Sequence, residues 1–277
     1  MNEKNFEYLK DNIKYLGFGE NLSSELEKNL KSGALEFQLT FSSEINRKPF
    51  SAILSFKRSE NTDMYFLNKY QASLQRNNGE KLEHTFYLNK GKGVTAKEAF
   101  NLLDGRAVQK ELLTKEGQTY KAWIQLDTEK KDLSKNFDVN QYHEKYGFNL
   151  TEALSRFQVS GINDLDKYKE LIKSLEKGNV QAVTIEKDGN SHKMFMEADP
   201  KYKTVKLYDA QMKLVTKEAI SSYQTVGKEA VAKSMNENVG NDKKKETNQD
   251  LSIKKKSEKS ALLPKNRESK KKGLGIS

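Results

Sequence analysis

"LEKNLKSGALEFQ" (Leu26–Gln38) joins the end of one helix to the start of a strand, and "LIKSLEKGNVQAV" (Leu171–Val183) repeats that order far downstream. When Gly33 is set against Gly178, a pair of leucines four residues apart precedes each glycine on one helical face. Glycine commonly ends a helix because it adopts the left-handed conformation without a steric penalty. The chain is therefore expected to form a helix, a glycine stop and a strand twice.

The first copy leads into a series of strands. Apolar residues alternate with polar ones after Gly33, which is typical of strands with one buried face. Four such runs are expected, at residues 34–41, 50–56, 64–74 and 84–88, and a further strand is expected at 120–127. Asn78-Gly79 favours a tight hairpin turn, and the short connections favour an antiparallel sheet.

The second copy is also followed by strands, at 180–186, 192–198 and 203–209. Similar helix starts then follow both sheets, "GVTAKEAF" (93–100) and "LVTKEAI" (214–220). In this alignment Phe37 falls opposite Ala182, although Val183 is expected to be buried, so the second copy needs a bulge or a different register. Duplication of an α-β-β-β unit and chance similarity of helix ends both remain open.

These patterns predict an α+β protein with two small antiparallel-sheet modules, each carrying packed helices. The first module is expected over residues 1–130 and the second over 131–226, with a charged linker or exposed loop at 128–136. Gly105 is expected to break or kink a helix within 103–113. Residues 227–277 are polar and are expected to form a disordered, lysine-rich tail.

The positive charge is concentrated at the end of the chain. Residues 251–277 hold nine Lys or Arg and two Glu, which accounts for +7 of the net charge of +10. Such a segment favours phosphate contact with DNA or RNA, although a solvated tail that aids solubility is an equal alternative. The candidate nucleic-acid-binding residues are Lys254, Lys255, Lys256, Lys259, Lys265, Arg267, Lys270, Lys271 and Lys272. No aromatic residue lies in this segment, so base stacking is not expected there.

A second candidate site precedes the helix expected after Thr95. Lys90, Lys92, Gly93 and Thr95 form a glycine-containing loop at a helix N-terminus, where backbone amides and lysines suit an anion. The loop lacks the phosphate-binding glycine motifs, so an ordinary strand-to-helix connection is the favoured alternative.

Other chemistry has little support in the sequence. There is no cysteine, the three histidines are scattered, and no catalytic, cofactor or metal motif occurs. Surface or cross-strand positions are expected for His84 and His192. The N-terminus lacks the apolar core of a signal peptide and no stretch is apolar enough to span a membrane, which favours a cytoplasmic protein.

Several longer stretches resemble a known family. "FYLNKGKGVTAKEAFNLLDGRAVQKEL" (86–112), "SLEKGNVQAVTIEKDG" (174–189) and the basic "LLPKNRESKKKG" (262–273) resemble the Bacteroidota proteins that share domain of unknown function 3945. Members occur on conjugative and other mobile elements, and the family carries no established activity. The resemblance implies a cytoplasmic accessory protein in mobile-element biology, with DNA or another mobile-element protein as partner.

We therefore expect a non-enzymatic accessory protein that binds nucleic acid through its basic tail. The alternative is a protein–protein interaction adaptor that uses its sheet modules. No cofactor, metal or membrane association is expected.

Overall fold

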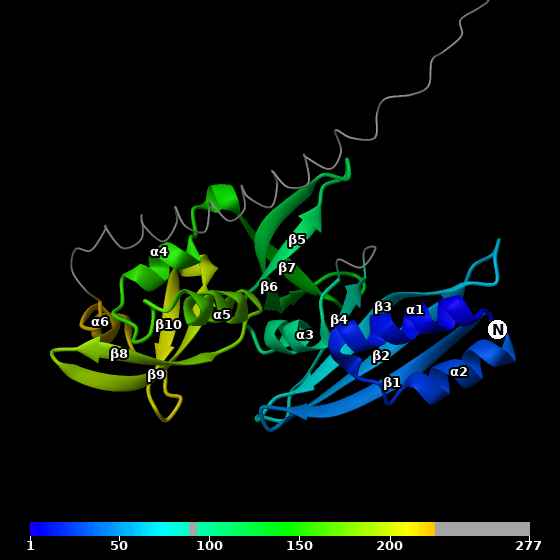
Figure 1. Ribbon diagram of the computed structural model, residues 1–277, viewed down its shortest axis with the longest axis horizontal. Helices are drawn as coiled ribbons and strands as arrows, with labels where there is room; N and C mark the ends of the chain where they lie inside the picture. The colour runs from blue at the N-terminus through cyan, green and yellow to red at the C-terminus, as the bar shows by residue number, and fades with distance from the viewer. Residues whose placement is uncertain (89–92, 225–277) are drawn as a thin grey trace, which may run out of the picture. The chain divides into compact units, whose positions relative to one another are not determined.

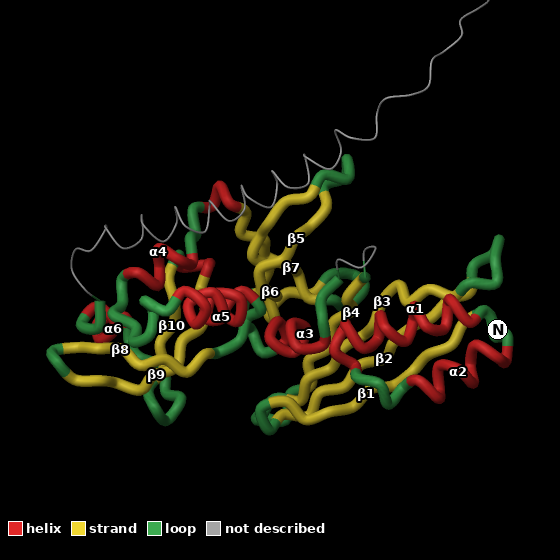
Figure 2. The backbone as a smooth tube through the Cα atoms, in the orientation of Figure 1, coloured by secondary structure: helices red, strands yellow, loops and turns green. Residues whose placement is uncertain are grey.

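The computed structural model describes residues 1–88 and 93–224; the expected tail at 227–277 lies outside the described residues. The described part contains six α-helices and three small antiparallel sheets (Figure 1; Figure 2). The predicted α+β class is confirmed.

The N-terminal sheet is a four-stranded antiparallel meander in the order β1-β2-β3-β4. Its strands are β1 (Glu36–Ile45), β2 (Lys48–Arg58), β3 (Tyr65–Gln75) and β4 (Lys81–Tyr87). They coincide with the four runs of alternating residues. Alternation along each strand sends one set of side chains into the core and the other set to the opposite face.

Three helices cover the inner face of this sheet: α1 (Glu3–Ile13), α2 (Ser23–Ser32) and α3 (Ala96–Leu103). Residues Lys14–Phe18 extend α1 by a π-helical turn. Leu9 and Ile13 of α1 and Leu26 of α2 are almost completely buried against the sheet, as their helical spacing predicts. Phe18, Tyr70 and other aromatic rings pack edge-to-face in the same core.

The middle sheet has the order β5-β6-β7, and the sequence patterns indicate only its central strand. It consists of β5 (Val108–Leu113), β6 (Thr119–Lys131) and β7 (Phe137–His143), of which β6 contains the strand expected at 120–127. The expectation of a broken helix within 103–113 is half correct. The α3 helix ends at Leu103 and Gly105 has φ +87°, but the chain then becomes strand β5.

The β6–β7 hairpin also affects the expected linker and domain boundary. Residues 128–131 belong to β6, so only the end of the segment 128–136 is a turn. Phe137 of β7 belongs to the same apolar core as the N-terminal sheet. A boundary at residue 130 would therefore pass through a hairpin and through this core.

His84 ties the N-terminal sheet to the hairpin. Of the two positions expected for it, surface or cross-strand, His84 takes the second: it pairs with Ala72 across β3 and β4 and is only 7% exposed. Its Nδ1 accepts a hydrogen bond of 3.2 Å from the backbone N–H of Phe137. The Thr85 N–H donates to Asn136 Oδ1 at 2.8 Å beside it. Burial lowers the pKa of His84 to about 4, although the Asp132 carboxylate acts in the opposite direction.

The C-terminal sheet has the order β10-β9-β8 and is again a meander. Its strands are β8 (Gln181–Lys187), β9 (Asn190–Asp199) and β10 (Thr204–Tyr208). The accompanying helices are α4 (Leu150–Ser155), α5 (Leu165–Glu176) and the short α6 (Lys217–Ser221), and 3₁₀ turns lie at Glu144–Tyr146 and Pro200–Tyr202. Val183, Ile185 and Met194 are buried, and α5 contacts β8 and β9 while α4 contacts β10.

The two repeated phrases form the predicted local structures. Gly33 and Gly178 both end a helix with positive φ, 73° and 75°, and each is followed by a strand. The expected difference in strand register between the two copies is also confirmed. The first buried strand residue is Phe37, four residues after Gly33, in the first copy and Val183, five residues after Gly178, in the second. Leu35, an apolar residue in the alternating run expected at 34–41, precedes β1 and is exposed.

No helix within residues 1–88 and 93–224 has the length and apolar character needed to cross a membrane.

Candidate nucleic-acid interface

The predicted site residues divide into those outside and those inside the described structure. Lys254, Lys255, Lys256, Lys259, Lys265, Arg267, Lys270, Lys271 and Lys272 lie outside the described residues, and so do Lys90 and Lys92. Gly93 and Thr95 are described, and they show how the start of α3 is built.

Thr95 is the N-cap of α3 and forms a capping box with Glu98. The Glu98 N–H donates to Thr95 Oγ1 at 3.4 Å, and the Thr95 N–H donates to Glu98 Oε2 at 2.8 Å. Lys110 Nζ lies 3.0 Å from the same carboxylate. The helix start therefore already holds a negative charge from the protein itself, which competes with an external anion at this position.

Gly93 has a packing role at the same helix start. A Cβ at this position would lie 3.0 Å from Leu88 Cα, so only glycine allows the chain to approach so closely. The Tyr70 hydroxyl donates to the carbonyl of Val94 at 2.7 Å, and burial raises the pKa of Tyr70 and keeps this donor protonated. A cavity of about 530 Å³ adjoins Gly93 and Thr95, and Tyr8 and Tyr15 of α1 and its π-helical extension also line it.

A different surface offers aromatic rings to a ligand. We call it the outer sheet face: the side of the β1–β4 sheet opposite its helices. One row of outward side chains crosses its centre, one from each strand in register: Thr40, Ile53, Gln71 and Thr85. Most of the side chains on this face are small or polar, so the sheet presents an accessible surface.

Two aromatic side chains stand at one end of the outer sheet face. Phe66 of β3 is 41% exposed and Tyr87 of β4 is 58% exposed. Lys57 pairs in register with Phe66, and Lys69 pairs with Tyr87. Lys57 Nζ lies 3.5 Å from the Glu36 carboxylate, whereas none of the described carboxylates lies within ion-pair distance of Lys69.

This arrangement is suited to bases rather than to phosphates alone. Exposed rings on a sheet can stack on the unpaired bases of a single strand, and a neighbouring lysine can contact its backbone. The alternation in β3 and β4 places Phe66 and Tyr87 out of phase with the buried residues of their strands. That signal was present in the sequence, but its meaning depends on which face the helices leave open.

Searches of the chain against known protein families, curated proteins and solved structures return no match.

Proposed function

We propose that this protein is a non-enzymatic accessory protein that binds single-stranded nucleic acid. The observation that carries the proposal is the pair of exposed rings, Phe66 and Tyr87, beside Lys57 and Lys69 on the outer sheet face. Bases stack on the rings, because every base has an apolar π-face. Residues 251–277, with their charge of +7, contact phosphates along the same strand.

The two parts contribute different properties to binding. The outer sheet face alone is close to neutral, because ion pairs join Glu36 to Lys57 and Glu83 to Lys81. It therefore supplies a preference for unpaired bases, whereas the lysine-rich segment supplies most of the salt-dependent affinity. The resemblance to proteins of mobile elements supports DNA as the natural ligand and the cytoplasm as the compartment.

The proposal is tested by measuring the binding of labelled oligo-dT, oligo-U and a DNA duplex over a range of salt concentrations. The proteins are the full chain, a chain that ends at residue 250, Phe66→Ala and Tyr87→Ala. Tyr202→Ala is the matched control, since Tyr202 is an exposed tyrosine in the 3₁₀ turn Pro200–Tyr202.

We expect the full chain to bind single strands more tightly than duplex. Removal of the Tyr87 or Phe66 ring should weaken single-strand binding by about tenfold, since one stacked base contributes about 1–3 kcal/mol. Truncation at residue 250 should flatten the salt dependence, by about 0.7 in the logarithmic slope for each phosphate of a single strand that the shorter chain no longer neutralises. Equal affinities of Tyr87→Ala, Phe66→Ala and Tyr202→Ala would exclude stacking on the outer sheet face, and an unchanged salt slope would exclude phosphate contact by residues 251–277.

A further inference from the structure

The β8 strand lies at the edge of its sheet and has backbone groups available for another strand. Residues 158–160 cover only one end of this edge: the Ser160 N–H donates to Thr184 O, and the Glu186 N–H donates to Gln158 O, both at 2.8 Å. The backbone groups of every second residue in a strand point to the same edge. The N–H and C=O of Ala182 therefore point to the edge that Thr184 and Glu186 also face. Within the described residues, neither group has a hydrogen bond outside the sheet.

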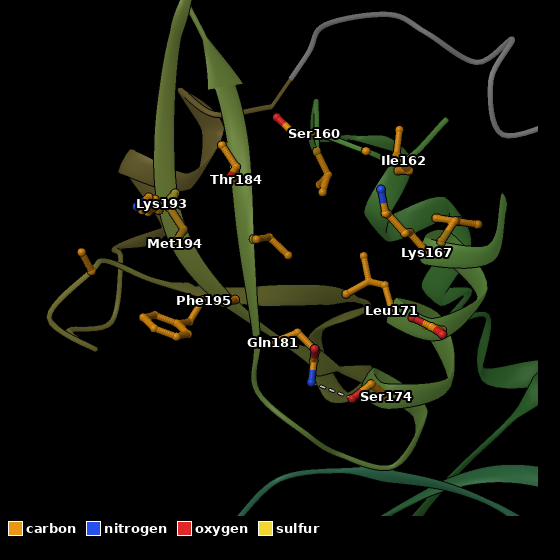
Figure 3. Close-up of a pocket in the computed structure, with 17 residues that line it drawn as sticks. Ser160, Ile162, Lys167, Leu171, Ser174, Gln181, Thr184, Lys193, Met194 and Phe195 are labelled. Atoms are coloured by element: carbon orange, nitrogen blue, oxygen red, sulfur yellow. Dashed lines mark hydrogen bonds between the residues drawn. The ribbon is translucent and has the colours of Figure 1, made fainter. Parts of the chain in front are cut away.

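A groove of about 820 Å³ runs along this uncovered part of the edge, between β8 and α5 (Figure 3). Lys167, Leu171 and Ser174 form the α5 wall, since residues four and seven positions apart lie on one helical face. Gln181 Nε2 donates to Ser174 Oγ at 2.6 Å and bridges the strand and the helix at one end. The loop from Val159 to Ile162 lies at the other end.

The two sides of the groove differ in chemistry. On the side of the buried residues, the lining side chains are apolar: Val159, Ile162, Leu171, Val183 and Met194. On the opposite side of the sheet lie Ala182, Thr184 and their register partners Phe195 and Lys193. Lys193 is exposed, and no described carboxylate lies within ion-pair distance of its ammonium group. The helix wall adds no net positive charge, because Lys167 lies 3.2 Å from Asp164 and Glu170 also lines the groove, so Lys193 carries the charge preference.

A strand added to β8 would meet both environments in turn. Successive side chains of an extended segment point to opposite faces, so one set would enter the apolar side and the next would face Lys193. We propose that the free edge of β8 binds an extended peptide segment of a partner protein in which aliphatic and acidic residues alternate. Backbone pairing with Ala182 provides the register, Leu171 and Ile162 select aliphatic side chains, and Lys193 selects carboxylates. This proposal is independent of nucleic-acid binding.

The test uses the full chain and fluorescein-labelled peptides of about seven residues, a length within the usual range for a strand. One peptide alternates valine and glutamate, a second alternates valine and lysine, and a third contains the valines and glutamates in two separate blocks. Binding is followed by fluorescence anisotropy, with oligo-dT as a competitor that should not displace the peptide.

The protein variants separate backbone pairing from charge. Ala182→Pro removes the edge-facing N–H, a change that edge strands tolerate. It should lower the affinity for the glutamate peptide by about tenfold or more. Lys193→Glu should lower the affinity for the glutamate peptide and raise the affinity for the lysine peptide. Lys4→Glu, on the exposed surface of α1, is the charge control and should leave both affinities unchanged.

Circular dichroism and thermal melting establish whether each variant is folded. If Ala182→Pro does not fold, the unaltered protein is tested instead with glutamate peptides that are N-methylated at every second amide, in the two possible patterns. Strand pairing is supported if only one of the two patterns abolishes binding. The proposal is overturned if the alternating glutamate peptide binds no better than the other two peptides, or does not bind at about 1 mM. It is also overturned if Ala182→Pro, or the methylated peptides, retain full affinity.

Discussion

The helix–glycine–strand phrase at Leu26–Gln38 and its echo at Leu171–Val183 share local structure but differ in packing. Leu26 is completely buried between α2 and the N-terminal sheet, whereas its counterpart Leu171 is only half-buried and lines the groove beside β8. Leu30 and Leu175 are buried in both copies. Two similar short sequences therefore close a core in one half of the described chain and line a groove in the other.

The one-residue difference in strand phase accompanies this difference. The first buried strand residue is Phe37 in one copy and Val183 in the other, four and five positions after the helix-ending glycine. In β1 the next inward residue, Leu39, is completely buried under the helices. In β8 the exposed Ala182 takes the position that corresponds to Phe37, so a small residue stands where a ring fills the first core. Similar local patterns thus do not imply equal packing.

The largest expected effect concerns the two leucines. Leu26→Ala should lower the free energy of unfolding by about 2–5 kcal/mol because it leaves a cavity in a closed core. Leu171→Ala should lower it by about 1 kcal/mol or less because the side chain is already partly in water. Urea unfolding of both variants measures the difference, and equal losses would contradict the contrast between core and groove.

The next effect is the loss of stability at acidic pH, which should depend on the buried histidine His84. The pKa of His84 is about 4 in the folded protein, below its value in the unfolded chain, so the unfolded chain binds more protons between pH 6.5 and 4. The free energy of unfolding should therefore fall by up to about 3 kcal/mol as the pH drops through this range, with no further contribution from His84 below it.

His84→Gln should remove this part of the pH dependence, whereas His192→Gln in the C-terminal sheet is the matched control and should retain it. Denaturant unfolding at several pH values measures both. An unchanged acid sensitivity in His84→Gln would show that the contact between His84 and Phe137 does not control the acid response.

A smaller difference in stability is expected between alanine substitutions of the two helix-ending glycines, Gly33 and Gly178. Both have positive φ, so alanine should cost about 1 kcal/mol at either position. At Gly178 the added Cβ would also lie 2.7 Å from the carbonyl oxygen of Ala107, whereas at Gly33 it would meet open space. Gly178→Ala should therefore cost roughly 2 kcal/mol or more, as measured by thermal unfolding of the two variants. If Gly33→Ala proves the costlier change, the packing of Gly178 against Ala107 is not important for stability.

The smallest effect concerns the helices that follow each sheet. Thr95 and Thr216 are both N-caps, but Thr95 belongs to a capping box with the buried Glu98, and Thr216 caps an exposed five-residue helix. Thr95→Ala should cost about 1 kcal/mol and Thr216→Ala less than about 0.5 kcal/mol. Equal values from chemical denaturation would indicate that the capping box adds nothing to the cap itself.

Much of the secondary structure could be predicted, but two strands were missed for a physical reason. The N-terminal and C-terminal sheets follow from alternation and glycine stops, because each strand buries one face. In β7 only Phe137 is buried and Val139 is exposed, so the strand has no alternating pattern to detect. Short β5 begins at Val108, three residues after Gly105, where the sequence indicated an interrupted helix.

The candidate sites show the same limit. Thr95 lies at a helix start, and its spacing from Glu98 is that of a capping box, which the structure forms; Lys110 reaches the Glu98 carboxylate through a contact that only the folded chain makes. Phe66 and Tyr87 were part of predicted strands, yet nothing local indicated that they would share an uncovered face.

The sequence by itself determined the α+β class, the helix stops at Gly33 and Gly178, and the phase difference between the two copies, because these depend on backbone conformation and on the spacing of apolar residues within a few positions. Only the tertiary structure decided that Leu26 closes a core while Leu171 lines a groove, that His84 is buried, and that, among the described residues, only 158–160 pair with the edge of β8. These properties depend on strand order and on which elements cover each face, and contacts between residues distant in the chain establish both.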